Sequence, residues 1–322
     1  MTVMNVRRRL IPTAAAAGAV ALGITSLSAC SASAAADRGS DGRLAVVASF
    51  YPMKFLAEKI GGEHVSVTTL TKPGVEPHDL ELDPRQIGEL SDADCIVYLK
   101  GLQPAVDDAV EQAGVETTVD AARLTTLEKH GAEVDGHERG HAAAKGDEAG
   151  ADPHIWLDPV KYAEVAKGVG KALEKADPDN AADYRENTGA LVNELAALNT
   201  AYENGLRNTA TRTFITTHSA FGYLAERYGL VQEGIAGLDP EAEPSPSRIK
   251  HIHDVARKSH ATTVFFEALA SDRTAKTMAK DIGLKTAVLD PVEGITDRSK
   301  GDDYTEVMKS NLTALRKALG AK

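Results

Sequence analysis

From residue 44 onward, short runs rich in β-branched residues alternate with amphipathic segments, and this alternation is the strongest constraint on the fold. Strands separated by helices pair in parallel through βαβ units, so the pattern predicts an α/β protein with mainly parallel sheets flanked by helices. The expected strands are 44–50, 64–70, 94–100, 117–119, 213–217, 230–235, 262–267 and 285–290. The expected shorter helices are 53–62, 84–90, 104–112, 248–259, 272–282 and 302–319.

One long helix is expected to divide this series. Residues 159–207 contain two helical stretches, and the second begins at about residue 181. Its apolar residues Leu191, Leu195, Leu198 and Tyr202 are spaced to share one helix face. A helix of about 27 residues is about 40 Å long, enough to run from one lobe to another. We therefore expect two similar lobes joined by one long rigid helix.

The length of the chain agrees with two lobes. At about 150 residues per domain, 322 residues suggest two domains, each large enough to bury its own core. Residues 125–152 interrupt the α/β pattern, because they are polar and have no sustained period, and we expect an exposed, mobile loop there. The predicted boundaries are 44–180 for the N-terminal lobe, 181–207 for the linking helix and 208–322 for the C-terminal lobe.

The first 43 residues have the pattern of an export and anchoring segment. A run of three arginines precedes an apolar stretch that is too short for a convincing membrane-spanning helix. The stretch ends in Leu-Ser-Ala-Cys, which resembles a bacterial lipobox, so residues 1–29 are predicted to be a lipoprotein signal peptide and Cys30 to carry the lipid. Residues 30–43 read as a flexible tether. An ordinary secretory signal with an incidental cysteine is the alternative.

Composition and charge exclude several classes of protein. A net charge of −11 argues against nucleic acid as a partner, because phosphate binding relies on clustered lysine and arginine. Two cysteines cannot form a disulfide scaffold, and Cys95, in an apolar run, is expected to be a buried thiol. No stretch beyond the first 30 residues could span a bilayer. The mature protein is therefore expected to lie on the outer face of a bacterial cell membrane, held there by lipid.

Three of the ten histidines lie where a ligand site is expected. His78, His154 and His218 are close to predicted strand ends, and in open α/β sheets ligands bind beyond the carboxyl ends of the strands. Asp290 and Glu293 follow the last predicted strand in the same way. His78, His154, His218 and Asp290 follow one another at intervals of 76, 64 and 72 positions, which is too far for a local metal finger and fits a site in a cleft between lobes. Three imidazoles and one carboxylate would suit tetrahedral Zn²⁺.

The motifs around these residues carry a family resemblance. The segments GVEPHDLELDP, DPHIWLDP, TTHSAFGYLAERYGL, DPEAEPSP and LDPVEG follow one another in order, and the chain resembles the zinc and manganese solute-binding lipoproteins of bacterial ABC transporters over nearly all of residues 44–322. The resemblance implies two lobes joined by a rigid helix with one metal ion between them. It also implies a non-enzymatic receptor that captures Zn²⁺ with high affinity and delivers it to ABC permease subunits for import. A single chain that binds one ion needs no partner, so a monomer is expected.

The resemblance also assigns the metal ligands by position. His78, His154 and His218 correspond to the first three ligands, and a histidine at the third position is typical of zinc binders, whereas many manganese binders have glutamate there. Family members use either an aspartate or a glutamate in the region of LDPVEG, so Glu293 is the favoured fourth ligand and Asp290 the alternative. Zinc members often carry a histidine- and acid-rich loop where this chain has His130, His137 and His141. A solvated linker with stray histidines is the alternative for that loop.

Other functions stay open at this point. The same fold could carry manganese or iron. A zinc hydrolase also uses three histidines with an open fourth position, but no HExxH, GxSxG or phosphate-loop motif is present. No sequence feature supports a surface adhesin role. Glu267, at the end of a predicted strand, is expected to make a hydrogen bond or ion pair rather than to bind metal, and Trp156 is expected to pack against the wall of the site.

Overall fold

The computed structural model describes residues 42–131, 150–269 and 273–322. The predicted signal peptide, Cys30, nearly all of the tether, His137 and His141 lie outside the described residues. Within the described ranges, the predicted alternation of strands and helices is confirmed.

Two four-stranded parallel sheets form the frame of the molecule. The first has the strand order β2-β1-β3-β4 and the second has the order β6-β5-β7-β8, so the second sheet repeats the topology of the first. All six neighbouring pairs of strands are parallel. The prediction of two similar α/β lobes is therefore confirmed. The strands are β1 (Leu44–Ala48), β2 (Val65–Thr69), β3 (Cys95–Tyr98), β4 (Thr117–Asp120), β5 (Thr213–Thr216), β6 (Val231–Gly234), β7 (Thr263–Phe266) and β8 (Lys285–Val288).

Helices cover both faces of each sheet. In the N-terminal lobe, α2 and α3 enclose one apolar cluster, while α1 and α4 cover the other face. In the C-terminal lobe, α7 and α8 cover one face and α9 lies against the other. Their bounds are α1 (Tyr51–Gly61), α2 (Pro84–Ser91), α3 (Pro104–Ala113), α4 (Pro159–Ala176), α7 (Pro246–Ser259), α8 (Arg273–Ile282) and α9 (Tyr304–Leu319).

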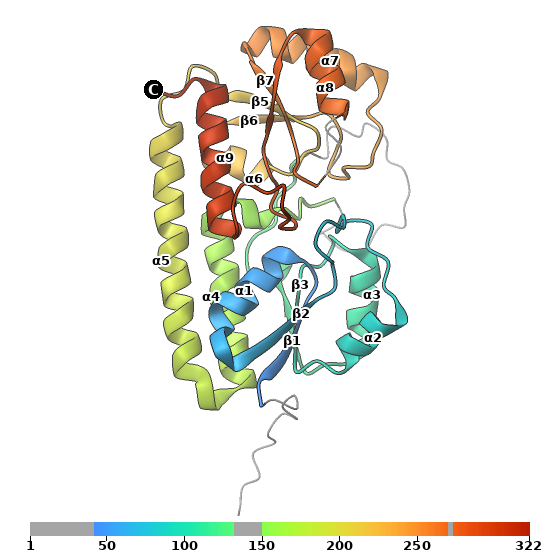
Figure 1. Ribbon diagram of the computed structural model, residues 1–322, viewed down its shortest axis with the longest axis vertical. Coiled ribbons are helices and arrows are strands. Elements are labelled where there is room, and N and C mark those ends of the chain that lie inside the picture. The colour runs from blue at the N-terminus through green and yellow to red at the C-terminus, as the bar shows by residue number, and fades with distance from the viewer. Residues whose placement is uncertain (1–41, 132–149, 270–272) are drawn as a thin grey trace, which may run out of the picture. The chain divides into compact units, whose positions relative to one another are not determined.

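The long helix α5 (Ala181–Leu206) runs along both lobes (Figure 1). It packs against α1 and α4 of the N-terminal lobe and against α9 of the C-terminal lobe. Its four predicted apolar positions are all buried, as the spacing required. Asn187 donates a hydrogen bond to the Ile60 carbonyl of α1, and the Tyr202 hydroxyl donates to the Met308 carbonyl of α9. The largest apolar cluster is continuous across both lobes, so α5 fixes one lobe relative to the other.

The described residues include several short helical elements that the sequence pattern does not predict, among them 3-10 turns of three residues each and one α-helix. Residues Gly222–Arg227 form a short helix, α6, which was not predicted. Six residues give fewer than two turns, too few for a periodic pattern, and four of them are buried, so packing rather than local sequence defines this helix.

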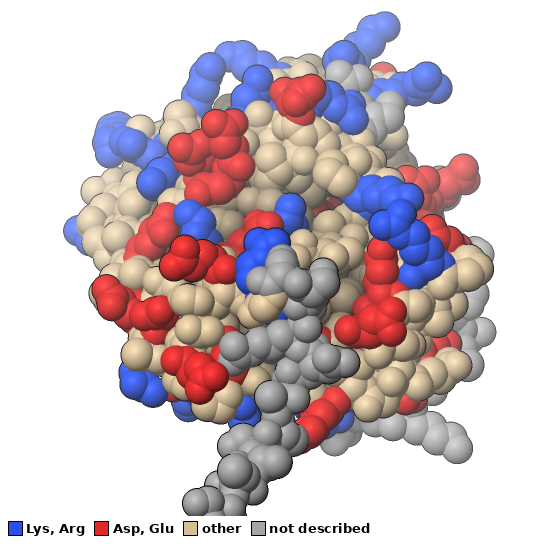
Figure 2. All heavy atoms as spheres, turned by 60° about the horizontal axis from the view of Figure 1, so that its bottom comes forward, with Lys and Arg blue, Asp and Glu red and all other residues tan. Residues whose placement is uncertain are grey.

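Side chains of both charge signs lie on the face of the molecule shown in Figure 2. On the face shown in Figure 2, groups of Asp and Glu lie between scattered Lys and Arg side chains of the described residues. In the part of the chain that the structure describes, no helix is both long enough and apolar enough to cross a bilayer.

Candidate metal centre

Four side chains from four different segments converge between the lobes. His78 lies in the loop between β2 and α2, and His154 lies between β4 and α4. His218 follows β5, and Glu293 follows β8. The ligand atoms of the four residues all lie within 4.8 Å of one another, so the structure brings together residues that are far apart in the sequence.

The spacing of these atoms is that of a small coordination sphere. Oε1 of Glu293 is 3.4 Å from Nε2 of His154, 3.6 Å from Nε2 of His78 and 4.0 Å from Nε2 of His218. The Nε2 atoms of His154 and His218 are 3.5 Å apart. Tetrahedral Zn²⁺ with bonds of about 2.0–2.1 Å places its ligand atoms about 3.3–3.4 Å from one another. These four distances are therefore near those of bound zinc, and the two remaining distances, from His78 to the other imidazoles, are at most 4.8 Å.

Two of the three imidazoles are oriented by buried carboxylates. Nδ1 of His154 is 2.7 Å from Oδ1 of Asp152, and the same oxygen accepts a hydrogen bond from the His154 backbone amide. Nδ1 of His218 is 2.6 Å from Oε1 of Glu267, as expected for a glutamate that forms a hydrogen bond rather than a metal ligand. A carboxylate on Nδ1 fixes the ring and leaves Nε2 to bind a metal ion. Asp152 was not identified from the sequence, although its position two residues before a histidine is a recognisable signal.

Buried polar atoms without partners gather at the same place. Both carboxylate oxygens of Glu293 and Nε2 of His78 are buried and have no hydrogen-bond partner. Such groups are costly in a protein interior, since each loses its contacts with water. A divalent cation would satisfy all of them at once.

Neighbouring charges shift the pKa values of this site strongly. Burial opposes the charged form of Glu293, but the imidazoles of His154 and His78 outweigh burial and lower the pKa of its carboxyl. Burial likewise opposes the charged form of His154, but Asp152 and Glu293 raise its pKa to about 9. In His218, burial is again outweighed, here by Glu267, and the pKa is raised. In the absence of a metal ion, the carboxylate of Glu293 and the imidazoles of His154 and His218 thus stabilise each other's charged forms.

Asp290 lies outside the four-residue group. Its Oδ1 accepts a hydrogen bond from the Val292 amide, and burial raises the pKa of its carboxyl to about 6. Trp156 packs on His154, with ring centroids 5.1 Å apart.

A cavity of about 500 Å³ lies next to the site. It is lined by Glu293 together with residues of α1 such as Tyr51 and Lys54.

A second, more exposed group lies at the base of the polar loop. Glu128, His130 and Glu226 each place a potential ligand atom within 4.8 Å of the others. Lys161 already pairs with Glu128 at 2.8 Å, and Nδ1 of His130 lies 3.1 Å from Oδ2 of Asp152. Of the three loop histidines, His130 is therefore the one whose surroundings the structure describes.

The fold and the candidate site together define a class, that of two-lobed α/β binding proteins with a ligand site between the lobes. The sequence profile of the family described as zinc-uptake complex component A, periplasmic (ZnuA), matches residues 46–318. The chain therefore belongs to this family, and the resemblance stated from its motifs is confirmed.

Individual relatives agree with this assignment. The zinc-binding lipoprotein AdcA of Streptococcus pneumoniae is 33% identical over 283 residues, which cover 86% of this chain and 56% of that protein. The high-affinity zinc uptake system protein ZnuA of Bacillus subtilis is 35% identical over 286 residues, covering 87% and 89% of the two chains. This chain thus spans little more than half the length of the AdcA relatives. The structure of the laminin-binding protein Lmb of Streptococcus agalactiae, described as having adhesin and metal transporting activity, has a TM-score of 0.75 at 30% identity and covers 86% and 99% of the chains.

Proposed function

We propose that this protein is an extracytoplasmic receptor that captures Zn²⁺ with high affinity and delivers it to an ABC permease for import. The ion would bind to His78, His154, His218 and Glu293. The observation that carries the proposal is the convergence of three imidazoles and one carboxylate, two from each lobe, at the spacing of tetrahedral zinc. The names of the AdcA and ZnuA relatives, which refer to zinc binding and zinc uptake, support this choice of cargo.

The donor set favours zinc over manganese or iron. Imidazole nitrogen is a preferred ligand of Zn²⁺, whereas Mn²⁺ suits carboxylate, carbonyl and water oxygens. Three of the four donor atoms here are nitrogens. Zinc is the transported ligand in this proposal, and the protein contributes no catalytic chemistry to it.

A carboxylate in the fourth position also separates this site from a zinc hydrolase. Catalytic zinc sites keep one position for water or substrate, and a general base must reach that water. Here Glu293 faces all three imidazoles. The further carboxylates on these rings are engaged in hydrogen bonds, Asp152 with His154 and Glu267 with His218 and Thr217. The protein is thus a receptor and not an enzyme in our proposal.

Binding would proceed by exchange of water for fixed ligands. The carboxylates of Asp152 and Glu267 hold two rings in place, so little side-chain entropy is lost when the ion arrives. Imidazoles that carry a proton must release it, because only the neutral ring coordinates a metal ion. The metal-bound protein, with both lobes joined through the ion, would then be the form that docks on the permease.

We further propose that the mature chain acts as a monomer anchored through a lipid on Cys30, with the lobe boundaries given above. The lipobox-like sequence before Cys30 and the lipoprotein name of the AdcA relative support the anchor. Replacement of Cys30 by serine should move the protein from the membrane fraction to the soluble extracytoplasmic fraction. Retention of the variant in the membrane without lipid would contradict the anchor.

Calorimetric titration of the chelator-stripped mature chain tests the metal assignment. We expect one tight equivalent of Zn²⁺ with weaker binding of Mn²⁺, and loss of tight binding in His218→Ala. His251→Ala is the matched control, because that histidine is half exposed and lies far along the chain on α7. Tight manganese binding would overturn the choice of cargo, and unchanged zinc binding in His218→Ala would overturn the site.

A further inference from the structure

The residue before Glu293 has an unusual backbone conformation. Val292 has a φ of 59°, in the left-handed region, and its side chain is completely buried. A β-branched residue is a true outlier at this angle, because its Cβ crowds the neighbouring carbonyl. Such a conformation persists only where surrounding contacts hold it in place.

Asp290 and Asn311 hold this turn from the C-terminal lobe. Oδ1 of Asp290 accepts a hydrogen bond of 2.8 Å from the Val292 amide. Asn311, on α9, forms two hydrogen bonds with the backbone of Asp290. Its Oδ1 accepts from the Asp290 amide at 2.9 Å, and its Nδ2 donates to the Asp290 carbonyl at 2.7 Å. All three residues are buried, so water cannot replace these bonds.

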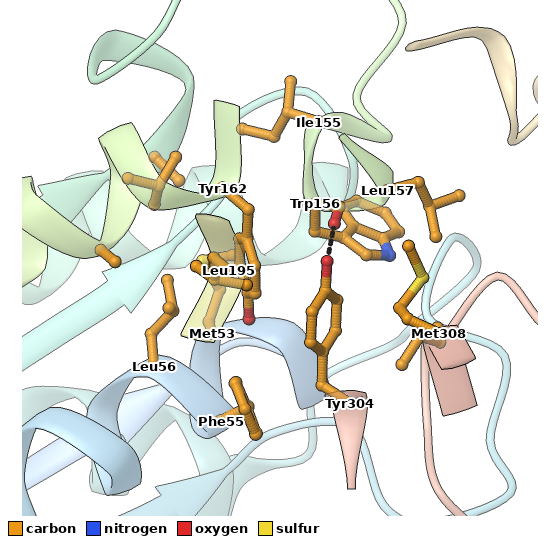
Figure 3. Packing of buried hydrophobic residues seen from close by; sticks show 14 of the residues in the cluster. Met53, Phe55, Leu56, Ile155, Trp156, Leu157, Tyr162, Leu195, Tyr304 and Met308 are labelled. Carbon is orange, nitrogen blue, oxygen red and sulfur yellow. Dashed lines mark hydrogen bonds between the residues drawn. The ribbon is translucent and has the colours of Figure 1, made fainter. Parts of the chain in front are cut away.

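Trp156 holds the same turn from the other lobe. Its indole Nε1 donates a hydrogen bond of 2.6 Å to the Pro291 carbonyl, while its ring packs on His154. The backbone carbonyl of Trp156 in turn accepts a 2.6 Å hydrogen bond from the hydroxyl of Tyr304, at the start of α9 (Figure 3). Trp156 therefore contacts one histidine of the site and the turn that carries the carboxylate.

Glu293 depends on this turn for its position. Its two carboxylate oxygens accept no hydrogen bond from a donor of the described residues, so no side chain outside the site orients them. The direction of the carboxylate is consequently set by the backbone of residues 290–293, which we call the clamped turn.

We propose that Trp156 and Asn311 are positioning residues that hold the clamped turn in its left-handed conformation and thereby direct Glu293 toward the three imidazoles. This inference rests on the proposed function, because it concerns the fourth ligand of the same site. Since Trp156 belongs to the N-terminal lobe and Asn311 to the C-terminal lobe, the position of Glu293 depends on the contact between the lobes. Separation of the lobes would break the Trp156 bond and release the turn, which weakens the hold on the ion.

The test is a double-mutant cycle on zinc affinity. Trp156→Phe removes the indole donor and keeps an aromatic ring. Asn311→Leu removes the two hydrogen bonds to Asp290, and a long contact of 3.9 Å to Met308 Sδ, at similar volume. Each is made in the wild-type and in the Glu293→Gln background, and affinity is measured by competition with a chromophoric chelator. Tyr202→Phe is the matched control, because it removes an equally buried hydrogen bond to α9 that does not touch the clamped turn.

We expect each clamp variant to lower zinc affinity about tenfold in the wild-type background and to have no further effect once Glu293 is replaced, because coupled residues are not additive. Tyr202→Phe should leave affinity unchanged. Equal losses in both backgrounds, or no loss in either, would overturn the proposal. An unchanged affinity in Glu293→Gln would overturn it as well, yet leave the receptor function on three histidines. Failure of the wild-type chain to bind zinc would instead overturn the proposed function.

A second measurement addresses the backbone directly and does not depend on metal. A protein with glycine at a given position is normally less stable than the same protein with alanine there, because glycine loses more conformational entropy on folding. Glycine, however, adopts positive φ without a steric penalty. We therefore expect Val292→Gly to resist urea better than Val292→Ala, both without metal. The opposite order would show that the backbone at residue 292 is not strained, and the clamped turn would lose its basis.

Discussion

Oε1 of Glu267 lies 2.6 Å from Nδ1 of His218, and the same oxygen accepts a hydrogen bond from the Thr217 hydroxyl. The contact joins the ends of two neighbouring strands, β5 and β7, and turns Nε2 of the ring toward Glu293. The hydrogen bond expected of Glu267 from the sequence is thus present in the structure, where it orients a histidine that we propose to be a metal ligand.

Replacement of Glu267 should weaken metal binding without removing it. Glu267→Gln keeps a hydrogen-bond acceptor but removes the charge that makes the ring more basic, so we expect zinc affinity to fall by about 10–100-fold. Chelator competition measures the effect. Glu233→Gln is the control, because Glu233 pairs with Arg248 and His251 outside the site. If both variants lost affinity equally, the role of Glu267 would be structural only.

Asp290 and Glu293 should respond differently to removal of their charge. Asp290→Asn retains the oxygen that accepts from the Val292 amide, so we expect zinc affinity to change less than about threefold, since neutral acceptors preserve most of such a bond. Glu293→Gln removes the anionic ligand, and we expect a loss of at least about tenfold. X-ray absorption of the zinc-loaded variants reports the number of oxygen ligands. A larger loss in Asp290→Asn would reverse the two assignments.

The sequence predicted most of the frame because strands and helices have periodic patterns. It also predicted the three histidines, since residues after parallel strands meet at one edge of a sheet. The relation of Asp290 to Glu293 could not be predicted, because it depends on the conformation of Val292 and on Asn311, which is 21 residues away from Asp290. Helix α6 could not be predicted for a similar reason, because packing across the molecule defines it. Asp152 is different, since its position two residues before His154 is a local signal that the motif offers.

Zinc binding should release protons and strengthen as the pH rises. His154 has a pKa raised to about 9 in the metal-free protein, where Asp152 and Glu293 outweigh the effect of burial. The folded, metal-free ring therefore keeps its proton at neutral pH, and zinc must displace it. For each displaced proton, affinity should rise about tenfold per pH unit up to the raised pKa. Calorimetry in buffers of different ionisation enthalpy counts the protons released.

The same raised pKa has an opposite consequence for the stability of the metal-free protein. A group with a raised folded pKa stabilises the fold fully below its unfolded pKa, here 6.5, and loses that contribution as the pH rises toward 9. Urea midpoints of the stripped protein should fall across this window, whereas those of the zinc-loaded protein should not. Proton release near zero at pH 7 would contradict both expectations.

Two glycines in helices should respond in opposite directions to alanine. A Cβ on Gly222, at the start of α6, would lie 2.3 Å from Cβ of His130 and 2.8 Å from Oδ2 of Asp152. Both distances are too short for a carbon atom, and overpacking costs about 1–3 kcal/mol. Gly189, within α5, has no atom within 4 Å of such a Cβ, so alanine there should stabilise the protein by up to about 1 kcal/mol. Because Asp152 holds His154, Gly222→Ala should also lower zinc affinity, while Gly189→Ala should not. Urea unfolding and chelator competition measure the two effects, and a stable Gly222→Ala protein would show that α6 can move away from His130 without cost.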